Sequence, residues 1–163
     1  LEKRKMPRAH KNPLTGKDCK GFYQSYHLGH RFMTDILEIK TTMQRSDLVS
    51  IYSLLYALLE GASEVLGIQR DDIEGTIFPQ GLGEPPTLIL YDDVPGGAGH
   101  VKRIQANLRE VMETALERVA GCECGAETSC YNCLRNYRNQ FHHDFLQRGS
   151  AADSLRWLLG IHG

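Results

Sequence analysis

The sequence lacks the features that mark several classes of protein. Its net charge is −1, so no overall excess of basic residues indicates a nucleic-acid-binding protein. Nothing at the N-terminus resembles a secretory signal peptide, and no apolar run approaches the roughly 20 residues that a membrane-spanning helix needs. The chain shows neither an internal repeat nor a low-complexity segment. Its 163 residues, 41% hydrophobic and 24% charged, are instead typical of a globular domain that can bury a core.

Cysteine is present, and its spacing is informative. Four of the five cysteines form the pattern Cys-x-Cys-x₅-Cys-x-x-Cys, at Cys122, Cys124, Cys130 and Cys133. Short loops of this kind can place four thiolates around one tetrahedral ion at about 2.3 Å, and four protein ligands predict a structural zinc site. Disulfides are less favoured, because two cysteines separated by one residue pair poorly. An iron–sulfur cluster and unliganded thiols remain alternatives, and reduced thiols predict a cytoplasmic protein.

The fifth cysteine lies in a basic stretch at the start of the chain. The first twenty residues hold seven basic and two acidic side chains, and they begin at Leu1 rather than at Met, so we expect a piece of a longer protein. His10 and Cys19 are candidates for half of a second metal site, completed by residues before Leu1 or by His27 or His30. The alternative is that Cys19 is an isolated buried thiol.

Apolar periodicity and turn residues predict the order of the secondary structure. The fold class that we expect is α/β, a small mixed sheet covered by two long helices, with a C-terminal four-cysteine zinc module. The expected domains are a basic irregular segment (1–25), an α/β core (26–120), and the zinc module with a terminal helix (121–163). The expected elements are a strand in 32–40, a helix from Ser46 or Asp47 to Gly67, strands in 71–78 and 87–91, a helix following residue 99 and a last helix capped by Ser150.

Two further segments could carry chemistry. The glycine-rich turn 92–99 between a strand and a helix resembles a phosphate cradle, but it lacks the Lys-Ser/Thr of a P-loop, so we favour a turn that needs positive φ over a ligand site. The carboxylates of Asp35, Glu38 and Asp92 could hold Mg²⁺, with Lys40 activating a water molecule beside it, as in a metal-dependent nuclease. Alternating polar residues on a half-exposed strand explain the same pattern more simply.

Three stretches together resemble one protein family. They are His-Leu-Gly-His-Arg-Phe-Met-Thr-Asp-Ile-Leu (27–37), Leu-Tyr-Asp-Asp-Val-Pro-Gly-Gly-Ala-Gly (90–99), and the terminal cysteines with Cys133-Leu134 and Asn139. The combination resembles the zinc-binding C-terminal domain of mitomycin-repair-type DEAD/DEAH-box helicases. It is also similar to a domain in the helicase-associated component of the DISARM anti-phage system. The resemblance runs from about Tyr26 to Leu159.

The resemblance implies a function for the parent protein. In such a family the four cysteines bind one structural zinc, and the parent acts on DNA, usually with ATP hydrolysis in separate motor domains. The chain has no Walker lysine and no Asp-Glu-Ala-His box, so we expect an accessory domain that is not itself an enzyme. It would support DNA binding and coupling to motor domains or a partner subunit, in DNA repair or anti-phage defence, with no membrane partner. A protein-docking domain is the other alternative.

Basic side chains near the cysteines are the candidates for nucleic-acid contact. They are Lys102, Arg103, Arg135 and Arg138. Such residues can neutralise phosphates, although charge alone favours a solvated helix face.

Overall fold

A computed structural model of the chain describes residues 4–5, 11–18, 22–23, 29, 31–40, 47–81 and 84–161. These residues fall into two compact units, Leu1–Arg31 and Phe32–Gly163. In the first unit, strands β1 (Arg4–Lys5) and β2 (Phe22–Tyr23) pair antiparallel, and Lys11 bridges Asp18. The basic segment expected to be irregular therefore contains a short strand pair. The second unit carries the core and the four cysteines.

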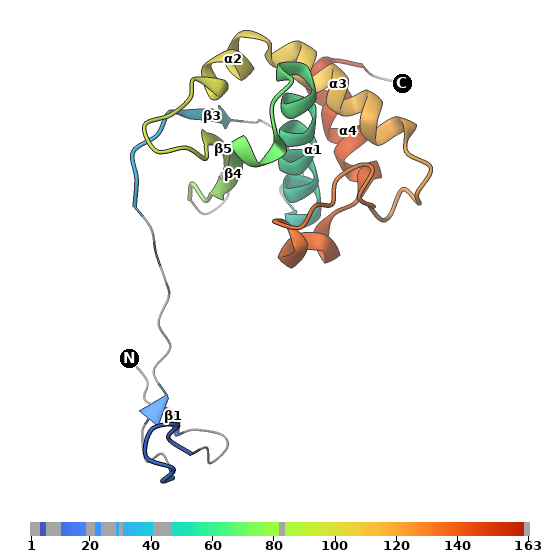
Figure 1. The fold of residues 1–163 in the computed structure, drawn as a ribbon. Coiled ribbons are helices and arrows are strands. Elements are labelled where there is room, and N and C mark those ends of the chain that lie inside the picture. The colour runs from blue at the N-terminus through green and yellow to red at the C-terminus, as the bar shows by residue number, and fades with distance from the viewer. Residues whose placement is uncertain are drawn as a thin grey trace. The chain divides into compact units, whose positions relative to one another are not determined.

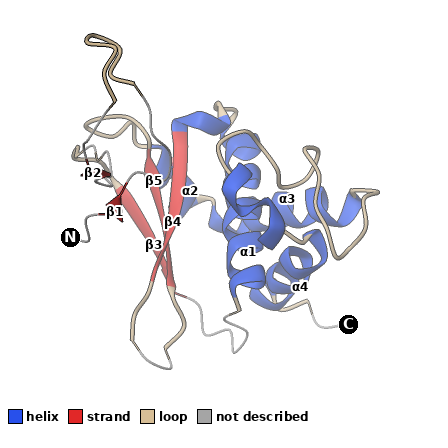
Figure 2. Ribbon diagram, turned by 90° about the horizontal axis from the view of Figure 1, so that it is seen from below, coloured by secondary structure: helices blue, strands red, loops and turns tan. Residues whose placement is uncertain are grey.

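The sheet of the second unit has three strands, β3 (Ile36–Lys40), β4 (Ile73–Phe78) and β5 (Thr87–Asp92). Their order is β3-β5-β4, and both pairings are antiparallel (Figure 2). The expected small sheet is confirmed, but the mixed pairing is not found among the described strands. A short loop joins β4 to β5, and short connections favour antiparallel neighbours because parallel strands need a long crossover.

Helix α1 (Leu48–Leu66) runs through the middle of this unit (Figure 1). Its limits agree with the sequence-based expectation: the Asp47 carboxylate accepts a hydrogen bond from Ser50 N at 2.8 Å, and Gly67 ends the helix at φ +61°. By length and composition α1 could cross a membrane, which we did not expect from the sequence. However, 67% of the apolar window is buried inside the fold, as in the core helix of a globular domain.

The second long helix expected after residue 99 is divided into two. Helix α2 (His100–Ala106) packs against β3 and β5, whereas α3 (Leu108–Gly121) packs against α1 and α4. The break is at Asn107, whose side-chain amide donates to Arg103 O at 2.8 Å. An asparagine side chain competes with the backbone for such carbonyls, which favours the end of a helix over its interior.

Helices α1 and α3 approach closely at Gly61. A Cβ atom built on Gly61 would lie 2.6 Å from Val111 O and 2.8 Å from Ala115 Cβ. Real Cβ atoms do not tolerate such distances, so a residue without a side chain is required at this crossing.

The last helix, α4 (Arg148–Leu159), begins earlier than expected. Its N-cap is Gln147, and Ser150 lies inside the helix, where its hydroxyl contacts Gln147 Oε1 at 3.3 Å. The Ser150 cap was therefore wrong. The physical reason is that Arg148 N and Gly149 N donate to the carbonyls of Thr128 and Ala126, so the cysteine-bearing loop satisfies the start of the helix.

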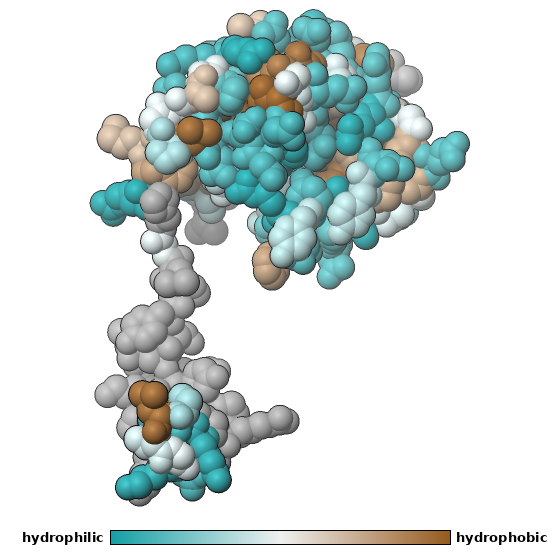
Figure 3. All heavy atoms as spheres, viewed as in Figure 1, coloured by the Kyte–Doolittle hydropathy of each residue, from teal (hydrophilic) through white to brown (hydrophobic). Residues whose placement is uncertain are grey.

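The described residues of this unit also form the 3₁₀ helices η1 (Arg70–Asp72), before β4, and η2 (Gln140–Phe145), before α4. The core contains side chains from α1, β5 and the other helices, and Leu54, Leu59 and Leu90 have no exposed surface. The face shown in Figure 3 is mainly hydrophilic, and its apolar side chains form small, separate patches.

Candidate metal centre

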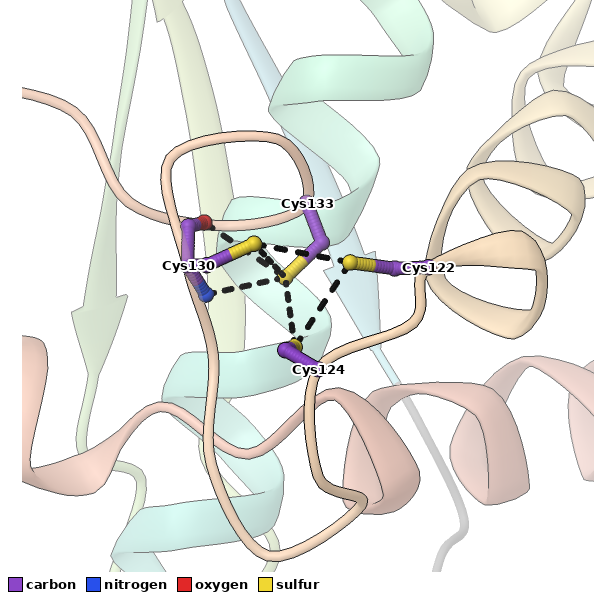
Figure 4. A group of neighbouring side chains, drawn as sticks. All are labelled: Cys122, Cys124, Cys130 and Cys133. Atoms are coloured by element: carbon purple, nitrogen blue, oxygen red, sulfur yellow. Dashed lines mark hydrogen bonds between the residues drawn. The ribbon is translucent and has the colours of Figure 1, made fainter.

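The four cysteine side chains point toward one another (Figure 4). Their sulfur atoms all lie within 4.8 Å of one another. The Sγ atom of Cys122 is 3.4 Å from that of Cys130 and 3.6 Å from that of Cys124, and Cys133 Sγ is 3.8 Å from Cys124 Sγ. Sulfurs at 2.3 Å from a tetrahedral zinc ion are separated by about 3.8 Å, so the four thiols fit this metal.

Each pair of cysteines is carried by its own turn. Cys122 ends α3 with extended backbone angles, and Cys124 follows in the next turn. In the second turn, Cys133 N and Leu134 N both donate to Cys130 O, while Cys130 N donates to Cys133 Sγ at 3.2 Å. A backbone N–H that donates a hydrogen bond to sulfur stabilises the thiolate, because the positive end of the N–H dipole points at the negative charge.

The cluster is closed on one side and open on the other. Cys133 and the adjacent Leu134 have no exposed surface, which fixes the second turn to the core. Cys122, Cys124 and Cys130 are partly buried and line an open cavity of about 480 Å³. All four ligand positions around an ion would be filled by protein, which is the pattern of a structural site.

The thiols of Cys130 and Cys133 differ in pKa because their surroundings differ. Burial opposes ionisation of Cys130, but hydrogen bonds from the Asn132 backbone N–H and from the neighbouring thiols outweigh it and lower its pKa to about 7. Burial raises the pKa of Cys133 to about 12. Cys130 therefore ionises more readily than Cys133, and a bound cation would favour the thiolate form of both.

Two arginines that the spacing pattern did not reveal contact the cysteine turns. Arg118 Nε donates to Cys133 O at 3.2 Å. Arg148 Nε donates to Cys124 O at 2.5 Å, and its Nη1 donates to Val119 O at 3.2 Å. Arg118 is four residues before Cys122 on a helix, which is a signal that could have been noticed. Arg148 is distant in sequence and gave none.

Arg118 also connects the cluster to a buried ion-pair network. Its guanidinium lies 3.3 Å from Glu60, which is 8% exposed and belongs to α1. Arg70 pairs with the same carboxylate at 3.3 Å, and Asn136 donates to it at 3.3 Å. Because a buried carboxylate must be fully paired, Glu60 fixes the segment after the cysteines to α1.

The glycine-rich turn is occupied by a carboxylate of the chain itself. Asp92 has no exposed surface and accepts hydrogen bonds from Ala98 N at 2.6 Å, Val101 N at 2.9 Å and His100 N at 3.1 Å. The turn includes Gly97 at φ +75°, which favours glycine. The donors of a phosphate cradle are present, but they bind Asp92, so the structure supports the turn rather than the ligand site.

The carboxylates considered for a nuclease site do not converge. Asp35 pairs with Lys102 at 2.9 Å, and Glu38 lies 3.9 Å from Lys40 with both side chains more than half exposed. Asp92 is used at the glycine turn. Within the described residues, the cysteine cluster is the only group of three or more His, Cys, Asp or Glu side chains placed to hold a metal ion.

Arg138, one of the candidates for nucleic-acid contact, is paired within the domain. Its guanidinium hydrogen-bonds the Asp93 carboxylate and lies 3.7 Å from Glu74 and 3.8 Å from Asp71. The hydrogen bond to Asp93 raises the pKa of this arginine. These contacts fix the segment after the cysteines to β4 and β5, and they partly neutralise the charge that a phosphate would need.

The other candidates also have partners. Arg103 Nη2 donates to Leu66 O at 3.2 Å, and Arg135 Nε donates to Ser129 Oγ at 3.0 Å. Lys102, 72% exposed, is the most accessible of the ion-paired candidates. The structure does not bring these side chains together into one basic patch by any contact among the described residues.

The candidate second metal site cannot be located. His10 and Cys19 lie outside the described residues, as do His27 and His30. The half-site stays a prediction from the sequence.

Taken together, the antiparallel sheet, the helices and four converging thiols define a zinc-binding α/β domain. Comparison with known families gives the more particular assignment. Residues 54–134, which contain the four clustered cysteines and most of helix α1, match the family model of the MrfA Zn-binding domain. The chain contains a domain of this family.

Longer proteins contain similar regions. The chain is 33% identical over 168 residues to Druantia protein DruE of Escherichia coli (strain UMEA 4076-1), covering 89% of this chain and 9% of that protein. It also resembles the crystal structure of the DUF1998 helicase MrfA bound to DNA, with TM-score 0.59, 17% identity and coverage of 94% of this chain and 20% of the helicase. A second structure of MrfA, bound to DNA and AMPPNP, matches with TM-score 0.54 and 18% identity, covering 90% of this chain and 18% of the helicase. The chain thus spans a tenth to a fifth of these proteins' lengths.

Proposed function

We propose that this chain is an accessory, non-catalytic module of a larger helicase-type protein. In this proposal Cys122, Cys124, Cys130 and Cys133 hold one structural zinc ion, which orders the loop between α3 and α4. The observation that carries it is the separation of the four sulfurs, which match a tetrahedral zinc site and leave no ligand position for a substrate. Zinc would supply folding energy there and no reactive group.

The metal content of the purified chain tests the ligand set. We expect one zinc per chain at the cluster, lost in Cys130→Ser together with thermal stability. Asn132→Ala is the matched control, because it changes a side chain in the same turn without removing a thiol. An unchanged zinc content in Cys130→Ser would contradict the proposal. Cys19→Ser measured in parallel would reveal a second site as a further loss of zinc.

The parent protein is proposed to act on DNA in the cytoplasm, in DNA repair or anti-phage defence. Support comes from the family match and from the likeness of the fold to a region of a DNA-bound helicase. Labelled DNA incubated with the chain over a range of salt concentrations tests direct contact. Binding through phosphates weakens steeply as salt rises, and Lys102→Gln, an exposed site, should lower both affinity and the salt dependence.

Docking to motor domains or a partner subunit is the second candidate function. It is favoured by the ion pair of Arg138 with Asp93, which reduces the charge available for phosphates, and by the hydrogen bond that directs the Arg103 guanidinium to Leu66 O. Exposed aromatic side chains near the cysteines could contribute to such an interface, with Tyr137 80% and Phe141 85% exposed. Binding to the parent's other domains that persists at high salt, without DNA binding, would favour docking over DNA contact.

A further inference from the structure

The two cysteine turns are each held by an arginine from a neighbouring helix. Arg118 of α3 reaches the second turn through Cys133 O. Arg148 of α4 reaches the first turn at both ends, through Val119 O before Cys122 and Cys124 O after it. Each turn is thereby fixed by charge-assisted hydrogen bonds, which are stronger and shorter than neutral ones.

The charge of the site also favours these two positions. Four thiolates around one zinc ion leave two net negative charges, which are costly in a partly buried cluster unless cations lie nearby. Arg148 forms no ion pair with any carboxylate of the described residues, whereas Arg156 on the same helix pairs with Asp153 at 3.1 Å. The charge of Arg148 is therefore not compensated by a carboxylate, and its guanidinium is directed to the backbone of the first cysteine turn.

Arg118 differs in being shared with α1. It lies 3.3 Å from Glu60 and 3.4 Å from Glu64, so part of its charge is already neutralised. Its hydrogen bond to Cys133 O then serves mainly to hold the second cysteine turn at a fixed position relative to α1, and contributes less to balancing the charge of the site. From this difference we expect Arg148 to affect metal affinity more than Arg118.

We propose that Arg118 and Arg148 are positioning residues of the zinc site, which fix the two cysteine turns at the spacing the metal requires. The inference rests on the proposed ligand set of four cysteines. Each arginine acts through the backbone carbonyl of a proposed ligand residue, Arg118 through Cys133 O and Arg148 through Cys124 O, and Arg148 also donates to Val119 O in the last turn of α3. Groups that orient metal ligands in this way typically change metal affinity by about 10–100-fold when they are removed.

Metal affinity of the whole chain tests the proposal. Zinc binding is measured by competition with a chromophoric chelator, and Co²⁺ is used as a spectroscopic probe of tetrahedral thiolate geometry. We expect Arg148→Gln to weaken zinc binding by about 10–100-fold and to alter the Co²⁺ spectrum, and Arg118→Gln to weaken it less. Arg156→Gln and Arg109→Gln are matched controls on the same two helices, since their guanidinium groups pair only with exposed carboxylates.

A lysine variant keeps the test sharp if a glutamine variant folds poorly. Arg148→Lys retains the charge but cannot donate to Cys124 O and Val119 O through two separate nitrogens, so its affinity should fall between wild type and Arg148→Gln. Zinc affinities of both Arg148 variants equal to those of the controls would overturn the proposal. If the wild-type chain itself bound no zinc, or Cys130→Ser bound it normally, the proposed ligand set would fail instead.

Discussion

Helix α1 and the cysteine-bearing loop differ in what holds them. In α1, Leu54, Ala57 and Leu59 are completely buried, and the helix contacts the sheet, α3 and α4. Between Cys124 and Gln147 the described regular structure is the 3₁₀ helix η2. Hydrogen bonds from Arg118 and Arg148 hold the backbone at the cysteines, and Leu134 and Leu146 are the large apolar side chains that this loop buries completely or almost completely. Apolar burial stabilises the first region without a ligand, whereas the second buries fewer apolar side chains, so we expect its order to depend on a bound metal.

Removal of zinc should produce the largest difference between the two regions, measured as their hydrogen-exchange protection. Metal binding contributes about 10 kcal/mol or more to a small zinc site, so a strong chelator should abolish hydrogen-exchange protection in residues 122–147. Protection in α1 should persist, because its buried leucines lie in the apolar core. Simultaneous loss of protection in both regions would show that they form one cooperative unit.

A substitution in the core should destabilise helix α1, the region that depends on apolar burial. Leu58 is 1% exposed, and Leu58→Ala should lower the free energy of unfolding by about 2–5 kcal/mol, since it leaves a cavity in the core. Leu48→Ala, at a position 56% exposed on the same helix, is the control and should change it by less than about 0.5 kcal/mol. Urea unfolding of the zinc-loaded chain measures both. Equal effects at the two positions would contradict the placement of α1 in the core.

The crossing of α1 and α3 provides a sharper test of packing. Gly61→Ala should destabilise by about 1–3 kcal/mol, because the new methyl group would meet Val111 O and Ala115. Gly121→Ala makes the same chemical change at the end of α3, where nothing lies within 4 Å, and should be neutral or slightly stabilising. Thermal melting of the two variants is the comparison. Greater stability in Gly61→Ala would show that the helices are further apart.

The smallest expected effect is a pH dependence where the two regions meet. The His142 ring stacks on Tyr52 of α1 at 4.3 Å, and burial lowers its pKa from 6.5, partly offset by Glu74. Below pH 6.5 the unfolded chain takes up a proton more readily than the folded one, so the free energy of unfolding should fall as the pH falls.

His142→Gln removes this titration, and its unfolding free energy should depend less on pH than that of the wild type. Both proteins are compared in the zinc-loaded form, because acid also protonates the thiolates. If the unfolding free energies of the two proteins depended on pH in the same way, the lowered pKa of His142 would be contradicted.

The sequence predicted the elements that are encoded locally. The apolar period and the cap residues Asp47 and Gly67 determined α1, and the cysteine spacing identified the metal cluster. The break at Asn107 was missed, because apolar residues continue in helical register on both sides of it. Ser150 was wrongly taken as a cap, since the real partners of that helix end are carbonyls of a distant loop.

Contacts between segments that are distant in the sequence could not be predicted from residue spacing or apolar periodicity. Arg148 is 24 residues from Cys124, and neither spacing nor periodicity connects them. The glycine turn was only partly predictable: the missing Lys-Ser/Thr argued against a phosphate site, but the burial of Asp92 and its three hydrogen bonds required the fold.

The buried carboxylate of Asp92 already occupies the backbone N–H groups of the glycine turn, so it would compete with any free anion for them. A free anion could reach Ala98 N, His100 N and Val101 N only by displacing a covalently attached group whose effective concentration is very high. A turn that resembles a nucleotide-binding loop is thus closed to nucleotide phosphates by a side chain of the domain itself.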